Sequence, residues 1–457
     1  MARRVAVVGG GWAGLACAVE LAEAGVAVEV FEAARTLGGR ARAVTLDGLR
    51  ACEKIRRERA DGKAPGAQRP RHNMELGEGA STAQRSQRAA QQNFSQALTV
   101  DNGQHILVGA YRETLRLIDK VGAGRTALAR FPLHLEFPRE FRLAAPALPL
   151  PAPLHLAWAL AMSQGLRWQE KFAAMRLMRA LGKIRFRLPR DIPVSRLIAN
   201  QPPVLRRFLW GPLCLAALNT PIREASAQVF LNVLRDTLAA NRRAADLLLP
   251  ATDLSSLFPE PAARFIEARG GNVHRSTRID SLETLADFEH RVLAVAPWHL
   301  PALAPQIALP EMSWQPIATI YLLYPESVRL SFPMLGLANG HGQWVFDRGQ
   351  LGGPAGLLSV VISGGGPWQV LDHGQLGWAI HRQLAPLLQG LVLPKKIRVI
   401  EEKRATFACT PNLARPSATT ASPNLWLAGD YVAGDYPATL EGAVRSGIAV
   451  ARRILSS

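Results

Sequence analysis

Cysteine is scarce in this sequence, and its placement excludes several kinds of protein. Four cysteines occur among 457 residues, far apart and without a CxxC pair. Zinc sites and disulfide frameworks need cysteines at close spacings, so we expect no metal site, no disulfides and a reducing compartment. Zinc-finger and RNP-type signatures are also missing. Nucleic acid is therefore the weaker explanation of the net charge of +18.

Long uninterrupted apolar runs are missing as well. Residues 143–166 form the longest stretch without Asp, Glu, Lys or Arg, but four prolines between positions 146 and 153 would break a membrane-spanning helix. The pair Arg3-Arg4 precedes an apolar run that resembles an export signal, yet glycines interrupt this run from Gly9 onward. We expect neither a transmembrane span nor a signal peptide, which favours a cytoplasmic protein.

The glycines near the N-terminus fit a dinucleotide-binding unit. Residues 5–8 predict a buried parallel strand, and residues 9–14 form a G-x-G-x-x-G loop that leads into helical periodicity. A second apolar strand ends on Glu32, which sits where a carboxylate accepts ribose hydroxyls. The glycines allow the tight turn and the close approach of backbone to pyrophosphate, and the helix N-terminus attracts phosphates. The predicted dinucleotide contacts are Gly9, Gly11, Trp12, Ala13, Gly14 and Glu32.

Motifs further along the chain indicate which dinucleotide is expected. Gly38 and Gly39 follow the second strand and precede Arg40, whose guanidinium is suited to reach a pyrophosphate. Near the other end of the chain, the apolar run 425–428 leads to Gly429 and Asp430. These patterns resemble the flavin fingerprints of the amine oxidase and phytoene desaturase flavoenzymes. The resemblance implies FAD rather than NAD, with the aspartate at the ribityl–phosphate region.

A helical pattern follows Pro437, and proline just before a helix is a start signal. In the flavoenzymes that the sequence resembles, the N-terminus of this helix points at the flavin ring. The resemblance therefore adds Leu440 and Glu441 to the expected cofactor contacts.

Two longer segments carry a narrower resemblance. Residues 99–112 include Asp-Asn-Gly-Gln-His at 101–105, and residues 429–443 include Tyr-Pro-Ala-Thr-Leu-Glu-Gly at 436–442. Together they resemble the squalene-associated FAD-dependent desaturases, better described as the hydroxysqualene dehydroxylase family of hopanoid biosynthesis. The resemblance covers most of the chain except residues 50–98. It implies that Gly103 and Gln104 pass close to the isoalloxazine ring and that the backbone of Ile279 meets the adenine.

The activity that this resemblance implies is reductive removal of the hydroxyl group from hydroxysqualene, an apolar isoprenoid. A hydride from reduced FAD would replace the hydroxyl while an acid protonates it. His105, Asp435 and Tyr436 are the candidate acids, although a lone histidine beside an apolar strand is more often structural. The partner that reduces the flavin is not identified by the sequence.

Two alternative functions stay open. One keeps the fold and reverses the electron flow, as in a desaturase or oxidase of a polyprenyl or amine substrate. The other is a prenyl-lipid carrier that has lost its cofactor, as in GDP-dissociation inhibitors, but the intact glycine motifs argue against that loss.

The patterns together predict an α/β protein with two domains, the arrangement of amine oxidase-like flavoproteins. A Rossmann-like FAD-binding domain is expected from residues 1–49, 99–131, 243–299 and 396–457. A discontinuous α+β substrate domain is expected from a mostly helical lobe at 132–242 and a β-rich part at 300–395. Val273 and Ile279 are expected on short strands.

Two segments depart from the pattern around them. Residues 50–98 are rich in Arg, Gln, Ala, Ser and Gly and predict a disordered, low-complexity insertion, with a nucleic-acid arm or localisation signal as the weaker alternative. Residues 166–190 carry eight Arg or Lys against one acid, interleaved with apolar residues, and predict a basic amphipathic helix. Such a helix suits peripheral contact with an anionic membrane, here the inner face of the cytoplasmic membrane. The alternative is a helix with a core face and a solvated basic face.

Overall fold

The computed structural model describes residues 4–46, 98–146, 152–388, 390 and 392–457. It divides into two units, Ala43–Val100 and the combination of Met1–Arg42 with Asp101–Ser457. The smaller unit contains β3 (Ala43–Leu46) and all of β4 (Leu98–Asp101) except its last residue, Asp101. The insertion expected at 50–98 lies outside the described residues, except that Leu98 begins β4.

A five-stranded parallel sheet forms the centre of the nucleotide-binding domain. Its strand order is β10-β2-β1-β11-β17, and every neighbouring pair is parallel. The strands are β1 (Arg4–Val8), β2 (Ala27–Phe31), β10 (Asn272–His274), β11 (His290–Leu293) and β17 (Leu425–Leu427). Residues 5–8 of β1 are fully buried, as expected of a central strand that is covered on both faces.

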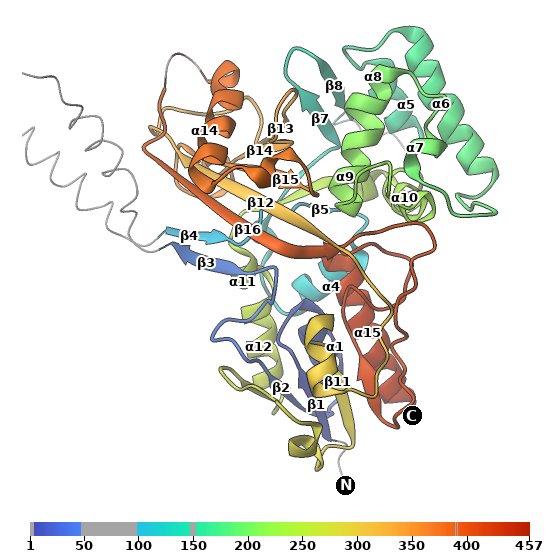
Figure 1. Cartoon of the computed structure of the whole chain (residues 1–457), viewed down its shortest axis with the longest axis vertical. Helices are drawn as coiled ribbons and strands as arrows, with labels where there is room; N and C mark the ends of the chain where they lie inside the picture. Colours follow the sequence, from blue (N-terminus) through green and yellow to red (C-terminus); the bar gives the residue numbers. More distant parts are fainter. Residues whose placement is uncertain (1–3, 47–97, 147–151, 389, 391) are drawn as a thin grey trace, which may run out of the picture. The chain divides into compact units, whose positions relative to one another are not determined.

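Helices from both ends of the chain pack together beside this sheet. They are α1 (Trp12–Glu23) and α15 (Leu440–Ser456), and α12 (Pro259–Glu267) from the middle of the chain also packs against α1; all three lie next to the parallel strands in Figure 1. The backbones of α1 and α15 approach so closely that a Cβ atom at Gly447 would collide with the carbonyl oxygen of Ala13. The two ends of the chain therefore form one domain.

A five-stranded antiparallel sheet forms the substrate domain, in the order β13-β14-β15-β12-β16. Its strands are β12 (Trp314–Leu323), β13 (Met334–Gly336), β14 (Trp344–Asp347), β15 (Leu357–Ser363) and β16 (Lys396–Phe407). Side chains alternate between its two faces. Val345 and Val360 pack on one face in a core that includes Ile380 of α14 (His373–Leu384), whereas Trp344 and Val361 join the main core on the other.

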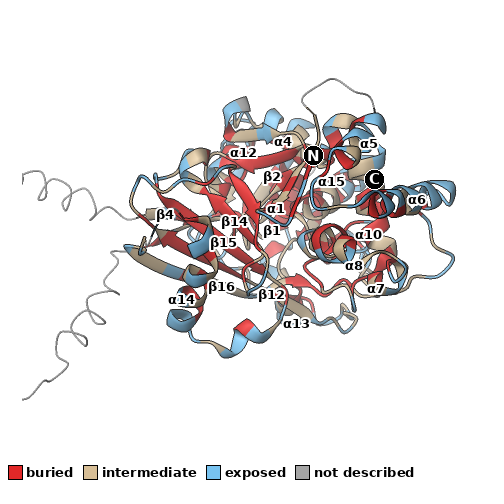
Figure 2. Cartoon of the chain, turned by 90° about the horizontal axis from the view of Figure 1, so that it is seen from above, coloured by how far each residue is buried: buried red, intermediate tan, exposed pale blue. Residues whose placement is uncertain are grey.

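A three-stranded sheet in the order β5-β9-β6, the β7–β8 pair and a helical lobe complete the fold. The remaining strands are β5 (Leu107–Val108), β6 (Leu128–Phe131), β7 (His134–Phe137), β8 (Phe141–Ala144) and β9 (Leu247–Pro250). The helices named below are α4 (Arg112–Lys120), α5 (Leu154–Ala161), α6 (Trp168–Lys183), α9 (Gly211–Leu218), α10 (Ala227–Leu234) and α11 (Leu254–Leu257). Figure 2 shows the buried strands of both large sheets enclosed by helices with exposed outer surfaces. The structure thus confirms the expected α/β two-domain class, with one parallel and one antiparallel sheet.

Several local expectations need correction. The lobe expected to be mostly helical begins with the β7–β8 hairpin. Within residues 166–190 the helix covers only Trp168–Lys183, because Arg185 and Phe186 take left-handed backbone angles that end it. Ile279 lies outside any strand, since the chain turns after β10 at Ser276, which has a φ of 53°. Across the described ranges, no helix combines the length and the apolar character needed to cross a membrane.

Candidate active site

A cavity of about 690 Å³ opens where the parallel strands end. Val8, Phe31, Ala294 and Gly429 lie at or just beyond the carboxyl ends of β1, β2, β11 and β17, and all four line it. Ligands of open α/β sheets bind at this edge, where the strand order reverses. The cavity therefore lies where the sequence places the dinucleotide.

The glycines of the loop after β1 differ in what surrounds them: two are packed against backbone and one faces open space. At Gly9, which has a φ of 112°, a Cβ atom would lie 2.6 Å from the carbonyl oxygen of Ala294, and at Gly14 a Cβ would collide with the Gly9 carbonyl. Both glycines are required by packing. Gly11 differs, because its nearest neighbour in the direction of a Cβ is the Cα of Gly39 at 4.0 Å. This open side of Gly11 faces the cavity, together with Trp12 and Ala13 at the start of α1.

Glu32 is held at the carboxyl end of β2 by two backbone amides. Its Oε2 accepts a hydrogen bond of 2.7 Å from the N–H of Gly10, and its Oε1 accepts one of 2.8 Å from the N–H of Ala34. The segment after β10 is tied to the same place, because the N–H of Thr277 donates to the carbonyl of Glu32. Ile279 follows in that segment and lines the cavity. The carboxylate of Glu32 is expected at the ribose and the backbone of Ile279 at the adenine. The two thus lie along one wall of the cavity.

Arg40 and Asp430 come together although 390 residues separate them in sequence. Nη2 of Arg40 donates to Oδ1 of Asp430 over 2.6 Å, and Nη1 donates to the carbonyl of Ala405 over 2.6 Å. Both side chains line the cavity beside Gly38 and Gly39, which have φ values of 104° and 60°. The two motifs with the flavin resemblance therefore form one continuous surface.

Asn102 was not among the residues predicted from sequence, and it fixes the position of this surface. Its Nδ2 donates to the carbonyl of Arg40, and its Oδ1 accepts from the N–H of Arg42 over 3.2 Å. The preceding residue, Asp101, accepts a hydrogen bond from the N–H of Leu254 at the start of α11. Burial raises the pKa of the Asp101 carboxyl to about 6. The Asp-Asn-Gly turn at 101–103 was the available signal, because side chains in such turns bind nearby backbone.

The segment with Gly103, Gln104 and His105 lines the cavity next to this turn. Nδ1 of His105 lies 2.7 Å from the carbonyl oxygen of Gly103, and because a carbonyl only accepts, Nδ1 carries the proton of the neutral ring. Burial lowers the pKa of His105, with the bond to Gly103 opposing the shift. The ring is therefore neutral at pH 7 and must first take up a proton at Nε2 before it can act as an acid.

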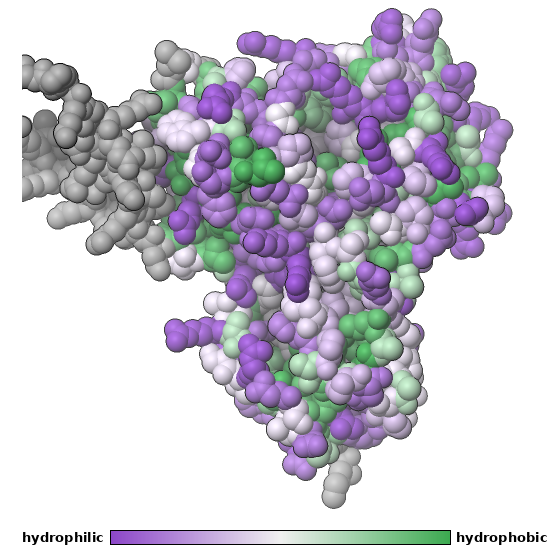
Figure 3. Space-filling model, in the orientation of Figure 1, coloured by the Kyte–Doolittle hydropathy of each residue, from purple (hydrophilic) through white to green (hydrophobic). Residues whose placement is uncertain are grey.

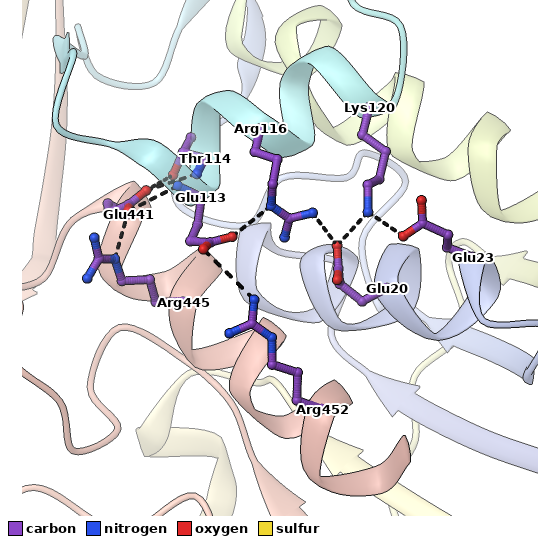
Figure 4. Close-up of polar contacts among 9 residues, drawn as sticks. All are labelled: Glu20, Glu23, Glu113, Thr114, Arg116, Lys120, Glu441, Arg445 and Arg452. Atoms are coloured by element: carbon purple, nitrogen blue, oxygen red, sulfur yellow. Dashed lines mark hydrogen bonds and ion pairs between the residues drawn. The ribbon is translucent and has the colours of Figure 1, made fainter. Parts of the chain in front are cut away.

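The start of α15 reaches the cavity, but one residue expected there does not. Thr439 caps the helix by accepting from the N–H of Gly442, and Thr439 and Leu440 both line the cavity. Glu441 is fully buried and points elsewhere, to the N-terminus of α4. Figure 4 shows its carboxylate between Thr114, Glu113 and Arg445. The helix begins three residues after Pro437, which turns the side chain of Glu441 away from the cavity.

Ion pairs continue from Glu441 along the whole of α4. Arg116 bonds Glu113 and Glu20, and Lys120 bonds Glu20 and Glu23 (Figure 4). Burial alone would raise the pKa of Glu20, but hydrogen bonds from Lys120 and Arg116 outweigh it and lower that pKa. This network joins α4 to α1 and α15, and α4 directly follows the segment that carries His105.

Asp435 and Tyr436, two of the candidate acids, are not among the residues that line the cavity. Asp435 is exposed, and the hydroxyl of Tyr436 donates to Oδ2 of Asp236 over 2.6 Å. Burial and this bond raise the pKa of Tyr436 far above its usual range. Both residues belong to a loop that Arg415 stabilises. The guanidinium of Arg415 donates to the carbonyl of Tyr436 over 2.9 Å. Of the three candidates, His105 alone lies beside the cavity.

The antiparallel sheet contributes apolar and aromatic side chains to the cavity wall. Trp344 and Phe346 stand on one face of β14, and Val361 of β15 pairs with Trp344. A second cavity of about 380 Å³ shares Trp344 with the first. Its wall includes Phe137, Phe208, Leu215, Ile222 and Leu337. An elongated apolar molecule fits such a pair of cavities better than a small polar one.

The residues present fit a bound FAD. The open side of Gly11, the N-termini of α1 and α15 and the Arg40–Asp430 pair face one cavity. Among the described residues, the hydroxyl of Tyr431 is buried without a hydrogen-bond partner, and Tyr431 lines the same cavity. A buried polar group normally has a partner. No set of three or more His, Cys, Asp or Glu within the described ranges is placed to hold a metal ion.

Comparison with protein families gives two matches. Residues 88–455 match the family described as flavin containing amine oxidoreductase. Residues 7–55 match the NAD(P)-binding Rossmann-like domain. Together the two matches cover both sheets and both glycine motifs.

Comparison with individual proteins gives relatives that align along the full chain. A hydroxysqualene dehydroxylase from Sinorhizobium fredii is 26% identical over 498 residues, covering 100% of this chain and 99% of the relative. A probable zeta-carotene desaturase from Synechococcus elongatus is 22% identical and covers 99% of both chains. The crystal structure of an oxidoreductase from Methanosarcina mazei superposes with a TM-score of 0.67 at 14% identity, covering 98% of this chain and 100% of the other, and it shows the shared fold alone.

Proposed function

Because the chain belongs to the flavin-containing amine oxidoreductase family, we propose that it uses FAD to remove the hydroxyl group of hydroxysqualene reductively, giving squalene. Membership in this family confirms that FAD is the cofactor and that the protein is an FAD-dependent oxidoreductase, as the sequence predicted. The substrate and the direction of electron flow are the proposal, and with them a role in hopanoid biosynthesis. The observation that carries the proposal is that Trp344 and Phe346 line the same cavity as the flavin motifs, and that Trp344 also lines a second cavity with a mainly apolar wall.

The relatives support the same substrate class. The dehydroxylase from Sinorhizobium fredii and the probable desaturase from Synechococcus elongatus are both named for isoprenoid substrates, and both align from end to end. An isoprenoid offers only apolar surface apart from its hydroxyl group. It therefore gains most from apolar walls and has little use for charged ones.

The proposed reaction breaks one carbon–oxygen bond and forms one carbon–hydrogen bond. Reduced FAD, held by the glycine loop and the Arg40–Asp430 pair, would supply the hydride and become oxidised, and the hydroxyl would leave as water after taking up a proton. His105 would hold that proton at Nε2, because its Nδ1 already donates a hydrogen bond to the carbonyl of Gly103. The faces of Trp344 and Phe346 stabilise positive charge that develops on the allylic carbon. The apolar walls keep bulk water from capturing that carbon.

A desaturase with the opposite electron flow is the second candidate. It is favoured by the zeta-carotene desaturase from Synechococcus elongatus among the full-length relatives. The same apolar walls suit either substrate, so the direction of electron transfer must be tested. The cofactor-free carrier has less support, because the Arg40–Asp430 pair and the open side of Gly11 face an intact dinucleotide cavity.

The test offers both reactions to the same purified holoenzyme without oxygen. Photoreduced protein is mixed with hydroxysqualene, and oxidised protein is mixed in parallel with squalene and with a carotenoid precursor. The proposal predicts that hydroxysqualene restores the oxidised flavin spectrum and yields squalene, while the oxidised protein keeps its spectrum. Bleaching of the oxidised flavin by either hydrocarbon would instead establish the desaturase.

A further inference from the structure

The outer surface of α5 and α6 is the most apolar exposed region that the structure describes. Of the eleven large hydrophobic side chains found exposed, seven lie between residues 154 and 184. They are Leu154, Trp158, Met162, Trp168, Phe172, Met175 and Ile184. Figure 2 shows α6 at the edge of the molecule with much of its length exposed. Single exposed hydrophobic residues are ordinary, but a concentration of this kind marks an interaction surface.

Helical spacing arranges these side chains in two stripes. On α5 and the residue after it, Leu154, Trp158 and Met162 are each four residues apart, so they lie above one another on one side. On α6, Trp168 and Phe172 have the same spacing, with 64% and 55% of their surfaces exposed. The opposite side of α6 is buried, because Ala173, Ala174 and Leu181 pack into the core.

Lys171 joins the two stripes. Its Nζ donates to the carbonyl of Ala161 near the end of α5 over 2.6 Å and lies 4.8 Å from the ring centre of Trp168. The ring of Trp168 is also 6.4 Å from that of Phe172. The lysine thereby satisfies the end of one helix and orients the most exposed aromatic residue of the next. The stripes form one surface, hereafter the α5–α6 surface.

Positive charge continues this surface along α6. Arg176, Arg179 and Lys183 are exposed and lie within the same third of the helix circumference as Trp168 and Phe172. Within the described ranges none of the three forms an ion pair, and the acid Glu170 is already paired with Arg167. In Figure 3 apolar and hydrophilic residues are intermixed at the upper right, where α5 and α6 lie in Figure 1.

We propose that the α5–α6 surface binds peripherally to the surface of an anionic lipid bilayer. Aromatic and aliphatic side chains enter the boundary between headgroups and acyl chains, and the three cations meet the anionic headgroups. Charge selects this occupant over a second copy of the chain, because a symmetric pair would bring the same cations face to face. The core-facing side of α6 is separate from this surface and takes no part in the proposed binding. The proposal does not rest on the proposed reaction.

Vesicle sedimentation with the holoenzyme tests this proposal. The vesicles contain phosphatidylglycerol with phosphatidylcholine, or phosphatidylcholine alone. One variant combines Arg176→Glu, Arg179→Glu and Lys183→Glu, and a second combines Trp168→Ser with Phe172→Ser. The matched control carries three charge reversals at exposed positions of α12 and β16: Arg264→Glu, Arg398→Glu and Lys403→Glu.

Each cation near an anionic surface strengthens binding about fivefold, so loss of three weakens partitioning about a hundredfold at low salt, and their reversal to glutamate weakens it at least that much. We expect that loss in the charge variant, a loss of at least about tenfold in the aromatic variant, and a much smaller one in the control. The FAD spectrum should stay unchanged in all three, because no altered residue lines the cavity. Equal losses in the charge variant and the control would overturn the proposal. So would unchanged vesicle binding of the aromatic variant together with a new oligomeric state in sedimentation velocity, which would make the surface a self-interface.

Discussion

Replacement of Glu441 by glutamine separates a structural role from a cofactor role. The carboxylate is fully buried and accepts hydrogen bonds from the N–H groups of Glu113 and Thr114 at 3.2 and 2.9 Å, from Oγ1 of Thr114 at 2.8 Å and from Nε of Arg445 at 2.7 Å. All four partners are donors. A glutamine amide has one oxygen to accept and would place an N–H₂ group against some of these donors.

The size of the effect follows from these contacts. Breaking a buried ion pair costs about 3–5 kcal/mol, and the lower end applies because the side chain of Arg445 is 38% exposed and can be solvated. Unfolding entropy is about 2.1 cal/mol/K per residue, so a chain of 457 residues that unfolds as one unit loses about 1 °C of Tm per kcal/mol. We therefore expect Glu441→Gln to lower Tm by about 3 °C.

Thermal unfolding and FAD titration of the apoprotein check this expectation together. Glu113→Gln is the matched control: it removes the more exposed acid of the same network, and partly exposed ion pairs contribute about 0–1 kcal/mol. FAD affinity should change by less than about threefold in both variants, because neither residue lines the cavity. A tenfold loss of FAD affinity in Glu441→Gln with an unchanged Tm would refute the structural role and restore the sequence-based one.

Three further predictions concern the cavity. Gly11→Val should fold with the Tm of the wild-type apoprotein but bind no FAD, because its side chain enters open space rather than protein, whereas Gly14→Val should lose stability; flavin absorbance and thermal unfolding measure both. If His105 is the acid, log kcat should rise by about one unit per pH unit as pH falls from 8 toward 6.5, because burial lowers the pKa of His105, and His105→Asn should abolish this slope. A pH profile shared by His105→Asn and the wild type would remove His105 from the mechanism. Leu215→Trp should fill the second cavity and raise KM for the full-length substrate at least about tenfold, while a shorter isoprenoid alcohol and FAD binding are unaffected; equal effects on both alcohols would exclude this cavity as part of the substrate site.

The cofactor-binding part of the site was predictable because short local sequence patterns determine its structure. A glycine loop between strand and helix, with Glu32 at the end of the next strand, has few structural solutions. The position of Glu441 was not predictable in this way. The sequence places it next to Leu440 at the start of a helix, and only the helix register decides that Leu440 faces the cavity while Glu441 faces α4.

Residues that act across long sequence separations were missed for a related reason. Asn102 holds the carbonyl of Arg40 across 62 positions, and Arg415 holds the loop after β17 from a segment without regular structure. Nothing near either residue in the sequence indicates its partner. Trp344 and Phe346 were recoverable in principle, because alternation along a strand places both on one face. Which face meets the flavin motifs depends on the packing of the two sheets.

In the proposed reaction this chain transfers a hydride from its reduced flavin to the carbon that loses the hydroxyl group. The most direct test of this transfer is a single anaerobic turnover in D₂O, in which photoreduced holoenzyme reacts with one equivalent of hydroxysqualene and the product is analysed by mass spectrometry. The hydrogen at flavin N5 exchanges with solvent, so the account predicts squalene with one deuterium, formed in equal amount to the flavin reoxidised. Flavin that stays reduced, or squalene that forms without deuterium, would contradict it.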